Sequence, residues 1–590
     1  MPPRIDEVVY TVSCLDPDAH LLSVEVEVTG EFGDALVLFM PVWTPGSYLV
    51  REYARHVEDV RSGAERPTKI RKNAWKIATH GARTARVSYR LYANDLTVRT
   101  NHLDRRHAFW TGAATYLFPD GVRDFAAKVR VHAPEGWSVA TALARGEDGS
   151  YRASGVDELC DSPFECGAMS PQRFEVLGKR HVLWPADTGH QGAARWEELV
   201  RDVKLIVETE AKLLSRGDPP EDSLPYDEYH FLWTVSPRGR GGLEHERSCA
   251  LVTPPSLFHS RPGYLDVLSL VAHELLHLWN VKRIKPAGLV PYRYEEENLT
   301  RLLFWFEGGT SYFDWRVLRL AGLASPREYL EHLAELVGRV LDAPGARVHS
   351  LSDASFDAWV KAYRPDENTG NSTISYYAKG EVVCALLDLT IRARTGGSRG
   401  LDHVLVHLYW GYAKEGRALP EDGFVAAVRE ATGVDVSDEV ARWVESAGAL
   451  DPTEPLAAVG LRLERRPQKA KTVSLGIRAK ARGGRVYIDA VIRGSAAMRA
   501  GLDPGDELLS VGGRRVEDSL DGALERLHPG SELDVVFARD GLVDRRSLVV
   551  DPPPPGDAAL VPAADASPAA RALLDGWLGA GAFDSLGSKP

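Results

Sequence analysis

Two histidines stand four residues apart in the stretch VAHELLHLWN at 271–280, and a glutamate follows the first of them. On a helix, positions i and i+4 share a face, so His273 and His277 can direct two imidazoles at one cation. Glu274 would then be close enough to face a water on that cation. In this HExxH arrangement two histidines bind zinc and the glutamate acts as general base. The pattern therefore predicts a site for metal-assisted hydrolysis.

The surrounding sequence favours this interpretation over two histidines satisfied in an ordinary core. The flanks VLSLVA and LL are apolar nearly all round, which predicts a buried helix. Two histidines and a carboxylate are costly to bury without partners, and a metal ion removes that cost. A catalytic zinc normally has three protein ligands and one open position. We expect Glu307 in RLLFWFEGGTSYF, 30 residues after His277 (307 − 277), to be the third ligand; the alternative is a solvated glutamate at a helix end.

Three stretches of the sequence resemble known peptidases. HExxH followed by a glutamate on the next long helix is similar to the gluzincin zinc peptidases. HELLHLWNVKRIKP at 273–286, WFEGGTSYF at 305–313 and MPVWTPGSYLVREYARHV at 40–57 more narrowly resemble the glycyl aminopeptidase family. The resemblance implies a β-rich N-terminal domain, a thermolysin-like catalytic domain, a C-terminal PDZ domain and one zinc ion per chain. It also implies that the substrates are peptides with a free N-terminus and a small first residue, glycine or alanine.

The loop GGLEH at 241–245 resembles the exopeptidase motif of related aminopeptidases. The resemblance implies that Glu244 binds the free α-amine of the substrate, with Gly241 and Gly242 beside it. A fixed carboxylate that pairs with an ammonium sets how many residues lie beyond the scissile bond. This chain departs from those relatives at the next position, where it has His245.

Two alternatives stay open at this loop. Glu246 is near enough in sequence to share the role of amine anchor. Glu244 could instead be an ordinary loop carboxylate paired with Arg240 or Arg247.

A second motif, ISYYAKGEVV at 374–383, resembles the Tyr-x-Lys-Gly motif of the same aminopeptidases. The resemblance implies that Tyr377 donates a hydrogen bond to the tetrahedral oxyanion, which a phenol can do without being charged. Tyr376 takes this role if the alignment is off by one residue. The alternative is a pair of core tyrosines at the start of a helix.

The C-terminal third contains a segment similar to PDZ domains, VYIDAVIRGSAAMRAGLDPGDELLSVGGRRV at 486–516. The preceding SLGIRAK resembles the carboxylate-binding loop of that fold. Such a domain binds an extended peptide by strand addition. The ligand would be either the C-terminus of another peptide or a segment of this chain, and the groove would be lined by Ser474, Leu475, Gly476 and Ile477.

The pattern of apolar residues divides the chain into regions of different character. Segments such as HLLSVEVEVTG and ARVSYRLYA alternate or run apolar between turn residues, which predicts strands. After about residue 190, long helical patterns such as WEELVRDVKLIVETEAKLLS dominate. We expect a multidomain protein with a β-rich N-terminal domain at 1–175, a mainly α thermolysin-like catalytic domain at 176–452, a small β-rich PDZ domain at 453–550, and a Pro-rich linker with one short helix at 551–590.

The bulk composition argues against several other classes of protein. A chain of 590 residues is too long for a single core. Its net charge of −12 disfavours nucleic acid as a partner. The N-terminus has no apolar stretch behind a basic start, and no run approaches about 18 apolar residues, so we expect neither a signal peptide nor a membrane span. Five scattered cysteines without a CxxC pair favour a cytoplasmic chain with reduced structural thiols.

Three functions compete on these observations: a zinc aminopeptidase, a PDZ-guided zinc endopeptidase acting on C-termini or unfolded chains, and a binding protein with an inactive enzyme core. Glu244 separates the first two, because an amine anchor has no use in an endopeptidase. The N-terminal domain could contribute to the pocket for the first residue through TNHLDRRHAFWTGAATYLF at 100–118, which is dense in aromatic and charged residues. The alternative for this segment is a surface hairpin.

Overall fold

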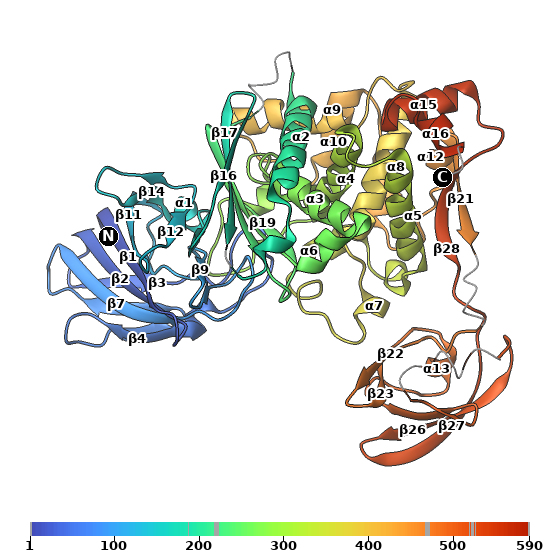
Figure 1. Ribbon diagram of the computed structural model, residues 1–590, viewed down its shortest axis with the longest axis horizontal. Coiled ribbons are helices and arrows are strands. Elements are labelled where there is room, and N and C mark those ends of the chain that lie inside the picture. Colours follow the sequence, from blue (N-terminus) through green and yellow to red (C-terminus); the bar gives the residue numbers. More distant parts are fainter. Residues whose placement is uncertain are drawn as a thin grey trace. The chain divides into compact units, whose positions relative to one another are not determined.

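The computed structural model describes residues 3–186, 188–216, 224–466, 473–517, 520, 524 and 527–587. The chain forms two compact units, which are described in turn. Figure 1 labels their helices and strands. The first contains the chain up to Thr300 together with Phe313–Ala324 and Leu405–Gly423. The second contains Arg301–Tyr312, Ser325–Val404 and the chain from Phe424. The β-rich N-terminal region, the mainly helical middle and the β-rich C-terminal region confirm the fold class expected from the sequence.

The N-terminal region of the first unit is built from strands whose side chains alternate between core and surface. In β2, Val24, Val26 and Val28 are buried while the residues between them face outward, as the VEVEV alternation predicts. β1 pairs with β2 antiparallel and with β11 parallel. The main sheet has the order β13 (Ala144–Arg145), β14 (Tyr151–Gly155), β11 (Asp124–His132), β1 (Arg4–Asp16), β2 (Leu21–Glu31), β7 (Thr84–Tyr92), β4 (Val57–Arg61).

Two smaller sheets complete this region. One has the order β10 (Phe118–Pro119), β3 (Ala35–Phe39), β6 (Ala74–Ala78), β5 (Thr68–Arg71). The other has the order β12 (Ser138–Ala140), β15 (Phe164–Gly167), β9 (His107–Trp110), β8 (His102–Leu103). The short helix α1 (Val156–Cys160) follows β14.

A mixed sheet and two long helices form a second part of the first unit (Figure 1). Its order is β16 (Gln172–Val176), β17 (Lys179–Ala186), β18 (Glu228–Val235), β20 (Ser248–Thr253), β19 (Gly241–Glu244). β17, β18 and β20 run parallel, and β19 forms an antiparallel edge. The helices α2 (Trp196–Leu214) and α3 (Arg261–Leu276) pack together against this sheet.

The second unit is mainly helical before its C-terminal β region. The π-helix η6 (Phe304–Gly309) leads into α4 (Thr310–Leu320), and η6 packs on α8 (Ala378–Arg394). The other helices before the PDZ region are α5 (Pro326–Asp342), α6 (Leu351–Phe356), α7 (Thr369–Ser372), α10 (Phe424–Thr432), α11 (Ser437–Val440), η9 (Ala441–Glu445) and α12 (Thr453–Ala458). A further helix, α9 (Leu401–Gly411), begins in this unit and continues into the first.

The PDZ region has the strand order β22 (Ile477–Arg482), β23 (Arg485–Val491), β24 (Glu507–Val511), β26 (Glu532–Arg539), β27 (Leu542–Val549), with β25 (Arg514–Arg515) beside β24. The short helix α13 (Ala496–Arg499) begins at Ser495, whose side chain accepts a hydrogen bond from the amide of Met498. The segment 453–466, which the sequence assigned to this domain, packs elsewhere, because α12 lies on α8 and β21 (Leu461–Arg466) pairs with β28 (Asp557–Pro562).

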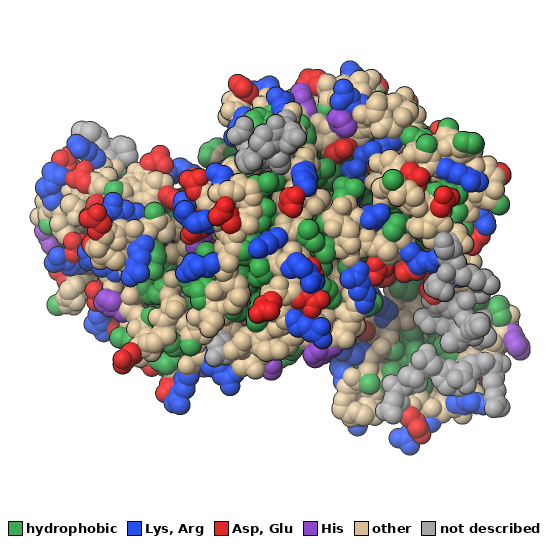
Figure 2. All heavy atoms as spheres, turned by 45° about the horizontal axis from the view of Figure 1, so that its top comes forward, with side chains coloured by type: hydrophobic (Ala, Val, Ile, Leu, Met, Phe, Trp, Pro, Cys, Tyr) green, Lys and Arg blue, Asp and Glu red, His purple; other side chains and the backbone are tan. Residues whose placement is uncertain are grey.

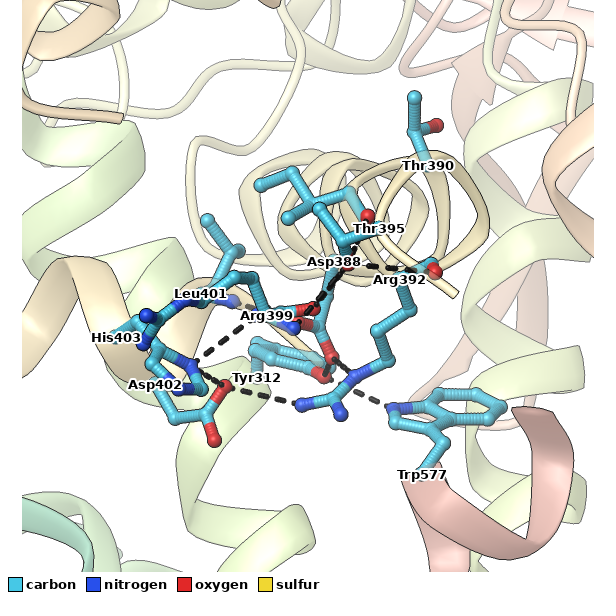
Figure 3. A network of polar contacts seen from close by, with 12 residues as sticks. Tyr312, Asp388, Thr390, Arg392, Thr395, Arg399, Leu401, Asp402, His403 and Trp577 are labelled. Atoms are coloured by element: carbon cyan, nitrogen blue, oxygen red, sulfur yellow. Dashed lines mark hydrogen bonds and ion pairs between the residues drawn. The ribbon is translucent and has the colours of Figure 1, made fainter. Parts of the chain in front are cut away.

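The C-terminal tail folds back onto the helices and is more than a linker with one helix. β28 follows the prolines directly, and α15 (Pro568–Leu578) and α16 (Ala582–Gly587) follow β28. α15 begins where Ser567 and Pro568 predict, and the Ser567 hydroxyl accepts a hydrogen bond from the amide of Ala570. Trp577 donates to the hydroxyl of Tyr312 at 3.0 Å, and that hydroxyl donates to Asp388 (Figure 3).

Two general expectations, on the cysteines and on membrane-spanning helices, can be compared with the structure. The five cysteines, all in the described part of the chain, are buried and free. Over the residues searched, no helix combines the length and the apolarity that crossing a membrane requires. Acidic and basic side chains are interspersed over the face displayed in Figure 2.

Candidate active site

The histidine pair lies at the C-terminal end of α3. His273 is in the last turn, and His277 is the residue that follows the helix, still with helical backbone angles. Their Nε2 atoms are 3.0 Å apart, and the two rings are perpendicular. Tetrahedral ligands about 2.0–2.1 Å from one zinc ion lie about 3.4 Å from each other. The pair is therefore spaced to share one cation, and its two nitrogens fit that role.

The outward nitrogens of both rings are held by neighbouring groups. His273 Nδ1 lies 3.0 Å from Asp314 Oδ2, and Asp314 Oδ1 accepts a hydrogen bond from Ser269. His277 Nδ1 lies 2.8 Å from the carbonyl oxygen of Asn280. Such partners fix the ring orientation and leave the lone pair of Nε2 free to face a metal. Sequence spacing alone did not show whether Asp314 reaches a histidine.

Glu274 is buried beside the pair. Its Oε2 has no hydrogen-bond partner among the residues that the structure describes. Burial raises the pKa of Glu274 to about 7, although charge on His273 and His277 lowers it. A Cβ on Gly242 would lie 2.1 Å from Glu274 Oε1, so a larger residue there would displace the carboxyl group. The carboxyl group is thus fixed against β19 and is poised to exchange a proton near neutral pH.

Glu244 ends the edge strand β19 and is buried. Glu244, Glu274 and His277 each offer an atom, and these atoms all lie within 4.8 Å of one another. A Cβ on Gly46, which has a φ of +83°, would lie 2.5 Å from Glu244 Oε1. Arg99 donates to the carbonyl oxygen of Gly242 at 3.0 Å. The N-terminal region therefore forms part of the wall around Glu244.

The loop after Glu244 bears on the two alternatives raised by the sequence. Glu246 is exposed, whereas Glu244 is buried. Neither arginine proposed as a partner is bonded to Glu244: Arg240 pairs with Asp266, and Arg247 pairs with Glu158.

His245, the departure from the related motif, belongs to a buried ionic cluster. Asp161 Oδ1 lies 2.5 Å from Lys282 Nζ and 3.3 Å from His245 Nδ1, and Asp161 Oδ2 accepts a hydrogen bond from the amide of Glu246 at 2.7 Å. Burial alone would raise the pKa of Asp161, but Lys282 and His245 hold it below its ordinary value. This carboxylate of the N-terminal region thus fixes the loop that carries Glu244. No pattern in the sequence indicated this role of Asp161.

The segment 100–118 is largely buried, with its exposed residues at the turn around Arg105 and Arg106. Phe109 belongs to a buried cluster that also contains Leu243 of β19. The segment is therefore part of the packing beside the site and not a surface hairpin.

In the second unit, Glu307 and the two tyrosines lie on segments that pack backbone to backbone. Glu307 is buried in η6, and π-helical turns frequently occur at functional sites. A Cβ on Gly308 would lie 2.5 Å from the Cα of Gly380, which explains the glycines of both EGG and AKG. Tyr377 is half-buried at the N-terminus of α8, whereas Tyr376 is buried, and their rings are 4.7 Å apart.

The predicted PDZ groove residues have several roles. Leu475 is part of the PDZ core, and the hydroxyl of Ser474 accepts a hydrogen bond from the amide of Gly476. Gly476 has a φ of +71° and closely approaches Ser495. Ile477 begins β22, which pairs with β23 and is an edge strand among the residues described. Among the described residues β22 thus presents an edge of the kind that strand addition uses, while the backbone of Ser474 is paired with that of Asp551.

Comparison with known proteins agrees with these features. Residues 9–168 match the family model of the Peptidase M61 N-terminal domain, residues 266–383 that of M61 glycyl aminopeptidase, and residues 487–539 that of a PDZ domain. No match was found among curated proteins.

Two solved structures are also similar. The crystal structure of an aminopeptidase N family protein from Idiomarina loihiensis has 28% sequence identity and a TM-score of 0.89, over 97% of this chain and 100% of that chain. A variant of an M1 zinc metallopeptidase from Deinococcus radiodurans has 13% identity and a TM-score of 0.45, over 76% of this chain and 96% of that one. The family matches confirm the resemblance to glycyl aminopeptidases, and the chain is a metallopeptidase.

Proposed function

We propose that this metallopeptidase is a zinc aminopeptidase that removes glycine or alanine from the N-terminus of peptides. One observation carries the proposal: a buried carboxylate, Glu244, lies within 4.8 Å of ligand atoms of Glu274 and His277. The first residue of a peptide places its ammonium only two bonds from the scissile carbonyl carbon, so an amine anchor must lie this close to the hydrolytic groups. The preference for small residues rests on the match to glycyl aminopeptidases.

The proposed zinc ligands are His273, His277 and Glu307. The spacing of the two Nε2 atoms supports the histidines. Two features support Glu307 as the third ligand. It is buried, and it lies seven residues before Asp314 (314 − 307), the partner of His273, on the continuous helical segment of η6 and α4. When bound, zinc would polarise the scissile carbonyl and lower the pKa of the attacking water.

The other proposed roles follow from the side chains themselves. Glu274 accepts the proton of the attacking water and passes it to the leaving amine. Glu244 binds the α-ammonium through a charge-assisted hydrogen bond. Tyr377, or Tyr376 in the alternative alignment, donates to the developing oxyanion. The half-buried position of Tyr377 favours it for a group that must reach substrate.

The PDZ domain is proposed to bind an extended segment along β22. The ligand would be a peptide C-terminus or a stretch of this chain. The exposed edge of β22 supports strand addition in either case.

Two peptides test the proposed activity. Zinc-loaded full-length protein is incubated with a short peptide that begins with glycine or alanine, and separately with its N-acetylated twin. Release of one residue from the free peptide alone is the expected result. Cleavage of both peptides contradicts the proposal and favours a PDZ-guided endopeptidase. Cleavage of neither, with zinc shown to be bound, also contradicts it.

A pair of matched variants then tests the anchor. Glu244→Gln removes the charge that pairs with the ammonium, so it should raise KM for the free peptide at least about tenfold, as a lost charge-assisted bond implies. Glu246→Gln changes the exposed neighbour and should leave KM unchanged. Equal effects of the two variants would contradict the role of Glu244.

A further inference from the structure

A short hairpin in the N-terminal region brings three metal-binding residue types onto one face. β8 and β9 are joined by the turn of NHLDRRHAFW, with His102 opposite Phe109 and Leu103 opposite Ala108. The amide of Asp104 donates to the carbonyl of His107 at 3.0 Å. His102 and Asp104 are two apart on one strand and so share a face, and His107, opposite Asp104, lies on that face too. The HxDxxH spacing on this hairpin therefore gathers two imidazoles and a carboxylate.

The three side chains converge at close range in a buried place. One atom from each of His102, Asp104 and His107 lies within 4.8 Å of the others. Both histidine side chains are 1% exposed, and that of Asp104 is 30% exposed. His102 Nε2 lies 3.3 Å from Asp104 Oδ2, close to the separation of about 3.4 Å between tetrahedral ligands of one zinc ion. The exposed side of Asp104 gives an ion a path of entry.

His102 is a buried imidazole whose nearest charged neighbour is the carboxylate of Asp104. Neither of its ring nitrogens makes a hydrogen bond with any residue that the structure describes. Leaving buried polar atoms without a partner is energetically costly. The contact with Asp104, at 3.3 Å, is longer than an ordinary hydrogen bond, and a cation between the two groups would satisfy both.

The other two residues are already oriented by hydrogen bonds. Asp104 Oδ1 accepts from the amides of Arg106 and His107 at 2.8 and 3.1 Å, which leaves Oδ2 for a cation. His107 Nδ1 lies 2.8 Å from Oε1 of the buried Glu165. A carboxylate at one imidazole nitrogen is the usual support for a metal at the other. The hairpin thus contains both the ligands and the groups that orient them.

We propose that His102, Asp104 and His107 bind a second divalent cation, Zn²⁺, in the N-terminal region. Two imidazoles and one carboxylate suit zinc and leave one position open for water. The cation would hold the hairpin closed beside Arg99, which contacts Gly242, and Phe109, which packs with Leu243. The role proposed for this cation is to stabilise the loop that borders β19.

Metal content in a protein without the catalytic histidines tests this proposal. Full-length His273→Ala/His277→Ala protein is stripped with a chelator, reloaded with Zn²⁺, desalted and analysed by elemental mass spectrometry. We expect about one zinc per chain in this variant and about two in the wild type, because each site binds independently. The variant leaves the N-terminal hairpin untouched, so a failure of the hairpin to fold cannot obscure the result.

Further variants in the same background locate the ion. Adding His102→Gln should reduce the zinc content to near zero, while adding His80→Gln should leave about one equivalent, because His80 is an exposed histidine whose loss controls for weak surface binding. Co²⁺ in place of zinc should give the visible absorption of a four-coordinate site that His102→Gln abolishes. A variant without the catalytic histidines that retains no zinc would overturn the proposal. Retention of zinc after His102→Gln would overturn it equally.

Discussion

Replacing Asp161 by asparagine should strongly destabilise the protein, because Asp161 is the anionic partner of a buried ammonium. Lys282 is 4% exposed and lies 2.5 Å from Asp161 Oδ1. Asparagine keeps the shape and can still accept the hydrogen bond from the amide of Glu246, so the substitution isolates the charge. Removing one partner of a buried ion pair costs about 3–5 kcal/mol, because the other charge is left uncompensated.

The free energy of deprotonating Lys282 sets an upper limit on this destabilisation. An ammonium without a partner can lose its proton, and for a lysine of ordinary pKa near 10.4 that costs about 4.6 kcal/mol at pH 7. The destabilisation by Asp161→Asn should therefore lie at about 3–4.6 kcal/mol at pH 7. The limit falls by about 1.4 kcal/mol for each pH unit above 7, so the effect should shrink toward pH 9.

Urea unfolding followed by fluorescence measures the effect, and a double-mutant cycle assigns it. Lys282→Met added to Asp161→Asn removes the stranded charge and should recover several kcal/mol, about 2 or more. Glu208→Gln, which breaks the exposed pair with Lys212, is the control and should cost less than about 1 kcal/mol. An Asp161→Asn protein no less stable than this control would refute the account of the buried pair.

The pH dependence of wild-type stability provides a second check on Asp161. Its pKa is lowered in the folded state, against the effect of burial, by Lys282 and His245. A lowered carboxyl pKa contributes stability that is present above the unfolded value of about 3.9 and is lost as pH falls through the folded value. The wild type should therefore lose stability below about pH 4, and Asp161→Asn should lack this component of the loss.

Three other substitutions test separate parts of the structure. Gly242→Ala places a Cβ 2.1 Å from Glu274 Oε1 and should lower kcat about 100-fold with zinc retained, whereas Gly239→Ala, whose Cβ meets nothing within 4 Å, should have no effect. Asp314→Asn should weaken zinc binding about 10–100-fold in a chelator competition, because Asp314 orients His273. Burial lowers the pKa of Lys379 from 10.5 to about 8. Folded stability should thus rise with pH between about 8 and 10.4, and Lys379→Met should add up to about 3 kcal/mol at pH 7 in urea unfolding and remove that rise.

Local spacing was enough to predict the parts of the site that lie on one element. The i, i+4 rule places His273 and His277 on one face, and the pair converges as expected. The contact of Asp314 with His273 depends on how α4 packs against α3, and no sequence spacing encodes that packing. The ion pair of Asp161 could not be predicted from spacing either, because its partner Lys282 lies 121 residues away in the sequence (282 − 161).

Several glycines near the site are explained by the close approach of another segment of the chain. Gly242 is required by the position of the Glu274 carboxyl group, and Gly46 by that of Glu244. Gly308 and Gly380 allow two segments to meet at the backbone. Each reason involves a second segment, so the sequence could mark these positions as special without showing what approaches them.

The contacts around Glu244 argue that the N-terminal region is part of the enzyme's site and not an appended module. Gly46 leaves room only for the Glu244 carboxylate, Arg99 holds the carbonyl of Gly242, and Asp161 fixes the residues after Glu244. An edge strand such as β19 has a neighbour on one side only, so groups outside its own sheet can contact its free side. That support comes from three separate points of the N-terminal region. A catalytic fragment that begins after residue 170 would therefore lose the geometry of the proposed amine anchor even if its histidines remained in place.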